Sequence, residues 1–136
     1  MRRSFVDTFY LIALSNRRDQ WHRCVVTCSR ALRDVRLYTV DEVLAKFLTF
    51  SSTLGAHIRT QAARTVRNAL DDPQWTVLPQ SRTSLLDALT LYDSRFDKEY
   101  SLTGFVSMQA MRREGLPDVL SNDHHFTQEG FYLLFA

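Results

Sequence analysis

Cysteine is nearly absent from this sequence, which argues against a fold held together by disulfides. The 136 residues contain only Cys24 and Cys28, which lie one helical turn apart, so no disulfide is expected between them. A zinc site formed by His22 with the two cysteines lacks a fourth ligand. We therefore expect both cysteines to be small apolar residues on the buried face of a helix.

Long apolar runs and a strong charge of either sign are also absent. No run approaches the roughly 20 residues of a membrane span, and the short apolar stretch that follows the first residues has no cleavage-site pattern. The net charge of +2 is too small to indicate nucleic-acid binding by itself. We expect a cytoplasmic protein that does not enter a membrane.

Lysine is scarce, so arginine supplies nearly all of the positive charge. Lys46 and Lys98 are the only lysines among 17 basic residues. Arginine binds phosphate bidentately and stacks on bases, which favours a nucleic-acid ligand. Because high-GC codon usage would give the same bias, both explanations stay open.

What the chain does contain is the pattern of one α/β domain spanning residues 1–136. Apolar residues make up 45% of the chain and charged residues 24%, as in ordinary globular proteins. Strands are predicted at 4–7, 36–40, 75–78, 117–121 and 132–135. Helices are predicted at 10–14 (with Thr8 as a possible cap), 20–33, 41–53, 58–70, 81–93 and from 101 or 103 to 114, with Gly55 and Gly115 as helix stops. Strands that alternate with helices predict a parallel sheet with helices on both faces.

Two of the predicted strands are followed by an aspartate. Asp7 follows the first strand, and Asp123 follows the strand that ends at Ser121. In an α/β protein, groups at the carboxyl ends of parallel strands converge on one crevice. Two carboxylates from opposite ends of the chain therefore indicate a divalent-metal site and phosphate chemistry.

Five segments carry motifs in a fixed order: VDTFYLIAL at 6–14, DQWH at 19–22, VLAKFL at 43–48, RFDKEYSLTG at 95–104, and LSNDHHF with a later GF at 120–131. In this order they resemble the PIN-domain nucleases, in particular the VapC-type toxins of bacterial toxin–antitoxin pairs. The resemblance covers essentially the whole chain. It implies a three-layer α/β/α fold with a mainly parallel central sheet, and cleavage of RNA that depends on Mg²⁺ or Mn²⁺.

The resemblance also implies site residues. Asp7 matches the first acid of the family site and Asp123 the last, so both are expected to bind the metal and to take part in catalysis. Thr8 stands where the family has a small hydroxyl residue beside the first acid. Asp97 belongs to a motif of the subgroup, but it lies several residues before the metal-site acid and is not expected to be a ligand.

Two expected acids are replaced. Lys46 stands where the family has a glutamate, and Gly104 where it has an aspartate. Each unit-charge pair at ~4 Å is worth about 4 kcal/mol at an effective dielectric of about 20, so these changes should weaken Mg²⁺ binding by orders of magnitude. We expect Lys46 to take the place of the metal and to pair with Asp7 and Asp123; the alternative is that it points to solvent. Glu42 lies a full helical turn away and does not obviously compensate.

The predicted function is accordingly a VapC-like ribonuclease toxin whose catalysis is impaired. The alternative is a non-catalytic PIN-fold protein that binds RNA or an antitoxin. The resemblance implies an RNA substrate, a cognate antitoxin and a homodimer. Arg95 and His124 are possible RNA contacts, with a structural salt bridge and a solvated loop residue as the respective alternatives. Ser101 is predicted to cap a helix.

Overall fold

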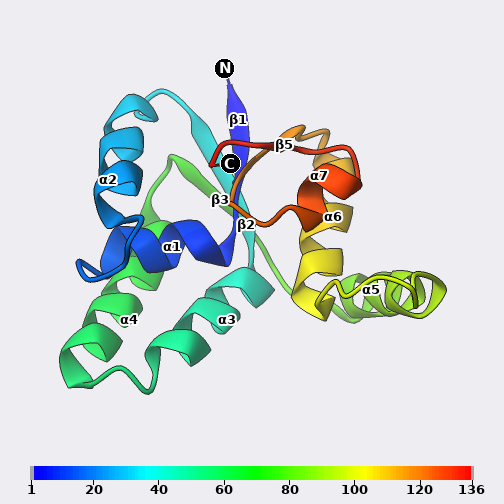
Figure 1. Ribbon diagram of the computed structural model, residues 1–136, viewed down its shortest axis with the longest axis horizontal. Coiled ribbons are helices and arrows are strands. Elements are labelled where there is room, and N and C mark those ends of the chain that lie inside the picture. The colour runs from blue at the N-terminus through cyan, green and yellow to red at the C-terminus, as the bar shows by residue number, and fades with distance from the viewer. Residues whose placement is uncertain (1, 136) are drawn as a thin grey trace.

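A five-stranded sheet forms the centre of the computed structural model, which describes residues 2–135 (Figure 1). Its strands are β1 (Arg3–Val6), β2 (Arg36–Val40), β3 (Trp75–Leu78), β4 (Asp118–Leu120) and β5 (Tyr132–Leu133). They lie in the order β3-β2-β1-β4-β5, and all neighbouring strands are parallel. Because β1 occupies the middle of the sheet, the residue that follows it lies at the centre of the carboxyl edge.

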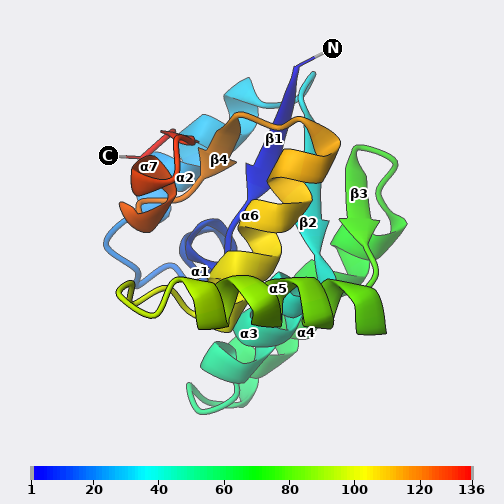
Figure 2. The same ribbon diagram turned by 90° about the vertical axis from the view of Figure 1, so that its right-hand side faces the viewer.

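Helices cover both faces of this sheet. They are α1 (Thr8–Ser15), α2 (His22–Ala31), α3 (Asp41–Ser51), α4 (Ala56–Asp71), α5 (Arg82–Ser94), α6 (Leu102–Glu114) and the short α7 (His125–Gln128). Helices α1, α2 and α4 lie on one side of the sheet, whereas α5 and α6 lie on the other (Figures 1 and 2). Helix α3 lies at the end of the sheet to which the strands point (Figure 1). The predicted three-layer α/β/α fold is confirmed.

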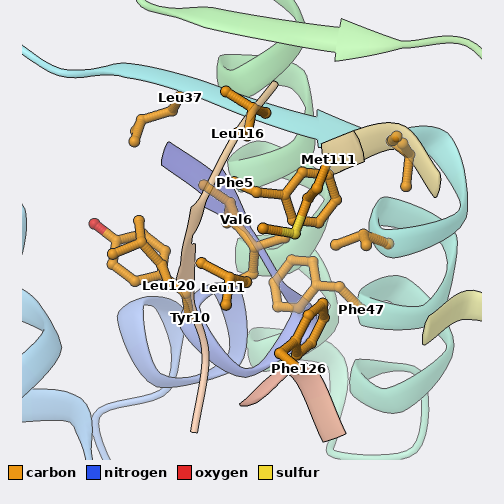
Figure 3. Close-up of a cluster of buried hydrophobic side chains, with 14 of the residues drawn as sticks. Phe5, Val6, Tyr10, Leu11, Leu37, Phe47, Met111, Leu116, Leu120 and Phe126 are labelled. Carbon is orange, nitrogen blue, oxygen red and sulfur yellow. The ribbon is translucent and has the colours of Figure 1, made fainter. Parts of the chain in front are cut away.

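The core forms where β1 and β4 pack between the two helical layers (Figure 3). Phe5, Val6 and Leu120 on these strands are fully buried, as are Leu11 of α1 and Phe47 of α3. Burying a side chain of this size contributes about 1.5–3 kcal/mol. This packing holds the ends of β1 and β4 and the neighbouring ends of α1 and α3 in fixed positions.

Most predicted elements are present, with differences at their ends. The strands predicted at 36–40 and 75–78 have these bounds, whereas the last strand is shorter than predicted. Thr8 is the first residue of α1 and not its cap. Gly115 ends α6 with a φ of 68°, as predicted, whereas Gly55 precedes α4 with a φ of 96°. A positive φ favours glycine at both positions.

Helix α2 departs from its predicted environment. Cys24 is exposed and Cys28 only half-buried, and neither is in a disulfide, so the prediction that both lie on a buried face is wrong. The physical reason is that α2 is an outer helix whose Val25 is its only fully buried residue. His22 does not join the cysteines, because its ring Nδ1 lies 2.7 Å from the carbonyl of Ala13. None of the helices described in residues 2–135 has the length and hydropathy of a membrane span.

Candidate active site at the carboxyl edge of the sheet

The pairing of β1 with β4 places Asp7 beside Ser121. Val6 and Leu120 are register partners, so the residues that follow them leave the sheet side by side. The backbone N–H of Asp7 extends this pairing by donating to the carbonyl of Leu120 at 3.4 Å. The local sequence explains the geometry, because Phe5 and Val6 at the end of β1 are apolar and fully buried, while the polar residue that follows them lies at the edge of the sheet.

Ser121 connects the two aspartates predicted from the sequence. Its hydroxyl donates to Oδ2 of Asp7 at 2.8 Å and accepts from the backbone N–H of Asp123 at 3.0 Å. The Ser121 side chain is fully buried. The structure thus brings Asp7 and Asp123 to one place and adds Ser121, which the sequence reasoning did not assign to the site. Its position two residues before the second aspartate, at a strand end, was the available signal.

The pKa of Asp7 is raised above its ordinary value of 3.8. Burial is the largest cause, and the negative charge of Asp123 adds to it. The hydrogen bond from Ser121 and the charge of Lys46 act in the opposite direction without outweighing burial. A carboxylate held in this way is one that a nearby cation would stabilise.

Thr8 lies beside Asp7 with its hydroxyl buried. The residue is 6% exposed, and its Oγ1 atom has no hydrogen-bond partner among residues 2–135. A buried hydroxyl without a partner costs free energy. The Thr8 hydroxyl therefore lies next to the first aspartate, as the sequence predicts, and is free to bind a ligand.

Lys46 does not pair with the aspartates. It lies exposed on α3, and no ion pair within 4.0 Å joins it to any acid in the described part of the chain. Its charge is still close enough to lower the pKa of Asp7. The predicted pairing with Asp7 and Asp123 is not formed, and the alternative of a solvated lysine holds. Because α3 buries Val43 and Phe47 on its inner face, the ammonium group of Lys46 can stay in water.

Gly104 lies in the first turn of α6. Its backbone N–H donates to Oγ of Ser101 at 3.0 Å, so the prediction that Ser101 caps this helix is confirmed. A Cβ atom added at Gly104 would have Oγ of Ser101 as its nearest neighbour at 3.4 Å, an ordinary van der Waals distance. The backbone therefore has room for a side chain at this position.

Arg95 is held by a buried carboxylate. Its Nη1 atom donates to both oxygens of Glu129 at 2.8 and 2.7 Å. Arg112 and the hydroxyl of Tyr100 donate to the same carboxylate at 3.1 and 3.2 Å. The structural salt bridge given as the alternative for Arg95 is thus formed. An RNA contact by Arg95 stays a prediction. Its guanidinium would have to bind an RNA phosphate while it also binds the carboxylate of Glu129.

The two histidines after Asp123 differ in their surroundings. The backbone N–H of His125 donates to Oδ1 of Asp123 at 2.9 Å, and its ring Nδ1 lies 3.3 Å from the same oxygen. The His125 ring also packs on the ring of Tyr100, with centroids 4.7 Å apart. His124 is exposed, and its predicted contact with RNA is untested. Of the two histidines that follow Asp123 in the sequence, His125 is the one that contacts its carboxylate.

Comparison with solved structures identifies the fold. The structure is similar to that of VapC20 from Mycobacterium tuberculosis, a toxin that cleaves the sarcin-ricin loop. The TM-score is 0.81 at 22% sequence identity, over 93% of this chain and 95% of that chain. The chain has a PIN-like fold. No known protein-family profile matches the sequence, and no curated protein sequence is detectably similar to it.

Two further solved structures share the PIN-like fold. FitAcB from Neisseria gonorrhoeae has a TM-score of 0.67 at 14% identity, over 97% of this chain and 96% of that chain. FitAB bound to an IR36 DNA fragment has a TM-score of 0.67 at 16% identity, over 96% of this chain and 93% of that chain. At these identities the similarity establishes the fold.

The donor groups at the carboxyl edge of this PIN-like fold do not fit a tightly bound divalent cation. Hard cations such as Mg²⁺ bind oxygen ligands and are usually held by carboxylates. The site offers Asp7 and Asp123 together with the hydroxyl of Thr8, while Lys46 adds an opposing charge. No group of three or more histidine, cysteine, aspartate or glutamate residues suited to a metal ion occurs within residues 2–135.

Proposed function

We propose that this protein is a VapC-type toxin of a toxin–antitoxin pair in which metal-dependent cleavage of RNA is impaired. The observation that carries the proposal is the meeting of Asp7 and Asp123 through Ser121 at the carboxyl edge of a PIN-like sheet. Similarity to VapC20, described as a toxin that cleaves the sarcin-ricin loop, supports RNA as the substrate class. Asp7, Asp123 and Thr8 are the proposed catalytic residues.

Impairment follows from the charges at the site. Lys46 and Gly104 change the pocket by three charge units relative to the expected acids, two from lysine in place of glutamate and one from glycine in place of aspartate. Even after solvent screening, several lost attractions should weaken binding of Mg²⁺ or Mn²⁺ by orders of magnitude. Because Lys46 is exposed to solvent, its repulsion of a metal ion is reduced. No other acid among the described residues takes the place of the two missing ones.

The proposed partners are RNA, a cognate antitoxin and a second copy of the chain, in the cytoplasm. Exposed Lys46 near the aspartates would repel a basic side chain that an antitoxin places at the site. Docking of an amphipathic antitoxin helix in an apolar groove does not depend on this charge.

A second candidate function is favoured by the absence of a third acid at the site among the described residues. In this alternative the protein binds RNA or an antitoxin without cleaving RNA. Titration of a fluorescent single-stranded RNA, followed by anisotropy at two salt concentrations, measures binding, which falls with salt where phosphates are contacted. Binding by the unmodified protein in the absence of cleavage supports this candidate.

The test of the main proposal is RNA cleavage in the presence of Mn²⁺. We compare the unmodified chain with the double variant Lys46→Glu/Gly104→Asp, for which the backbone at Gly104 has room. The double variant is expected to cleave roughly 100-fold faster or more, since restored acids strengthen metal binding by several kcal/mol. Adding Asp7→Asn to the double variant should abolish cleavage.

Lys98→Glu is the matched control, because it makes the same charge change at the only other lysine. It should leave activity at the level of the unmodified chain. If neither the unmodified chain nor the double variant cleaves any RNA, the proposed ribonuclease ancestry loses its main support. If the unmodified chain cleaves as fast as the double variant, the proposed impairment is wrong.

A further inference from the structure

Helix α5 is an outer helix with little of its surface covered. It lies across α6, on which it mainly packs (Figure 2). Ala88 is its only fully buried residue, whereas Leu86 and Leu89 are 51% and 50% exposed. Tyr92 is 53% exposed, and Phe96, just after the helix, is 89% exposed. Several large apolar side chains thus face water next to one another, which is typical of an interaction surface.

Four residues of α5 form a straight stripe that we call the α5 seam: Arg82, Leu86, Leu89 and Asp93. Their spacing of four, three and four residues is that of a helix packing seam. At 100° per residue the four positions fall within an arc of about 60°. All four residues are exposed, and this arc points away from the side of buried Ala88.

The two charges of the α5 seam stand at unfavourable ends of their own helix. Arg82 is the first residue of α5, and Asp93 lies in its last turn. The helix dipole favours acids at the N-terminus and bases at the C-terminus, so both charges oppose it. Neither residue has an ion-pair partner within 4.0 Å in the described chain. No ion pair among residues 2–135 therefore compensates for their placement.

We propose that the α5 seam pairs antiparallel with the α5 seam of a second copy of this chain. A two-fold axis that crosses the helices between residues 87 and 88 places Leu86 opposite Leu89 of the second copy. The same axis places Arg82 opposite Asp93 of the second copy, and both pairings occur twice. The seam is therefore complementary to itself, which is the requirement for a two-fold interface.

The antiparallel arrangement also removes the conflict with the helix dipole. Arg82 then lies at the C-terminal end of the second copy's helix, where a positive charge is favoured, and Asp93 lies at the N-terminal end. Exposed Tyr92 and Phe96 flank the seam and supply further apolar surface. The inference rests on the self-association proposed above and assigns it a surface.

The experiment measures the dimer dissociation constant by sedimentation equilibrium of the full chain. Arg82→Asp and Asp93→Arg each replace two attractive pairs by two repulsive ones, because the interface is two-fold. With exposed pairs worth up to about 1 kcal/mol, each single variant should weaken the dimer roughly 10- to 100-fold. The double variant Arg82→Asp/Asp93→Arg should recover most of this loss.

These variants separate association from folding. Each single change puts a favourable charge at that end of α5, so the thermal stability of the monomer should stay equal or rise. Leu86→Asp should also weaken the dimer, whereas Leu70→Asp, at a leucine of α4 that is 56% exposed, is the matched control and should not.

Recovery by the double variant supports the α5 seam. A dimer that is insensitive to all three seam variants overturns the seam and leaves self-association standing. A monomer at the highest concentration examined overturns both. Neither of these results depends on RNA cleavage, so the ribonuclease proposal is tested separately.

Discussion

Replacement of Glu129 by glutamine tests whether the arginine cluster around it is a structural anchor. The Glu129 side chain is 8% exposed and accepts hydrogen bonds from Arg95, Arg112 and Tyr100. It joins the segment after α5, helix α6 and the end of α7. Burial alone would raise the pKa of Glu129, but the hydrogen bond from Arg112 and the charge of Arg95 outweigh it and hold that pKa below its ordinary value.

The expected loss of stability depends on how exposed the two arginine partners of Glu129 are to water. Removing one member of a fully buried ion pair costs about 3–5 kcal/mol, whereas an exposed pair is worth about 0–1 kcal/mol. The side chains of Arg95 and Arg112 are 37% and 40% exposed, so water partly replaces the lost carboxylate. We expect Glu129→Gln to lower the free energy of unfolding by about 2–3 kcal/mol at neutral pH.

The assay is urea unfolding of the unmodified chain and the variant between pH 3 and pH 7. A carboxyl group with a lowered pKa stabilises the fold above its ordinary pKa of 4.5, and this contribution is lost as the pH falls. The difference between the two proteins should therefore shrink below about pH 4.5. Asp118→Asn is the control, because the Arg2–Asp118 pair at 3.5 Å is largely exposed on the arginine side.

The control should change stability by less than about 0.5 kcal/mol. A loss for Glu129→Gln no larger than that of the control would refute the anchoring role. A loss that is equal at pH 3 and pH 7 would show that the effect comes from packing and not from charge. In either case Arg95 would be available to contact RNA.

Three further predictions concern the edge of the sheet and the two ends of α6. Asp7→Asn should stabilise the fold by on the order of 1 kcal/mol at pH 7, because a raised pKa means that the charged form is disfavoured. Thermal unfolding should show this gain vanishing near pH 3, where Asp7 is protonated in both states. Gly115→Ala should cost about 1–2 kcal/mol at its φ of 68°. Gly104→Ala, in helical backbone, should instead gain up to about 1 kcal/mol, and a loss there would contradict the free space beside Gly104.

The order of the elements and the place of the site could be predicted from the sequence because both depend on local patterns. Short runs rich in apolar and β-branched residues mark the strands at 36–40 and 75–78, and helical spacing marks the segments between strands. Once the sheet is parallel, the polar residues after β1 and β4 must share an edge. Asp7 and Asp123 meet there for this reason.

Side-chain contacts between distant residues could not be predicted in the same way. The direction of Lys46 depends on which face of α3 is buried and on the cost of taking an ammonium group out of water. The partners of Glu129 come from three separate segments, so no local spacing reveals them. For Cys24, helical spacing defines a face but does not say that α2 is an outer helix.

The hydrogen bond between Ser121 and Asp7 joins residues 114 positions apart and depends on the pairing of β4 with β1. During synthesis on the ribosome, Asp7 is made well before its partner strand β4. A nascent chain, or a product of premature termination before residue 118, therefore contains one aspartate without the other. Whatever the site binds in the finished protein, it can bind only after β4 and Asp123 have been made.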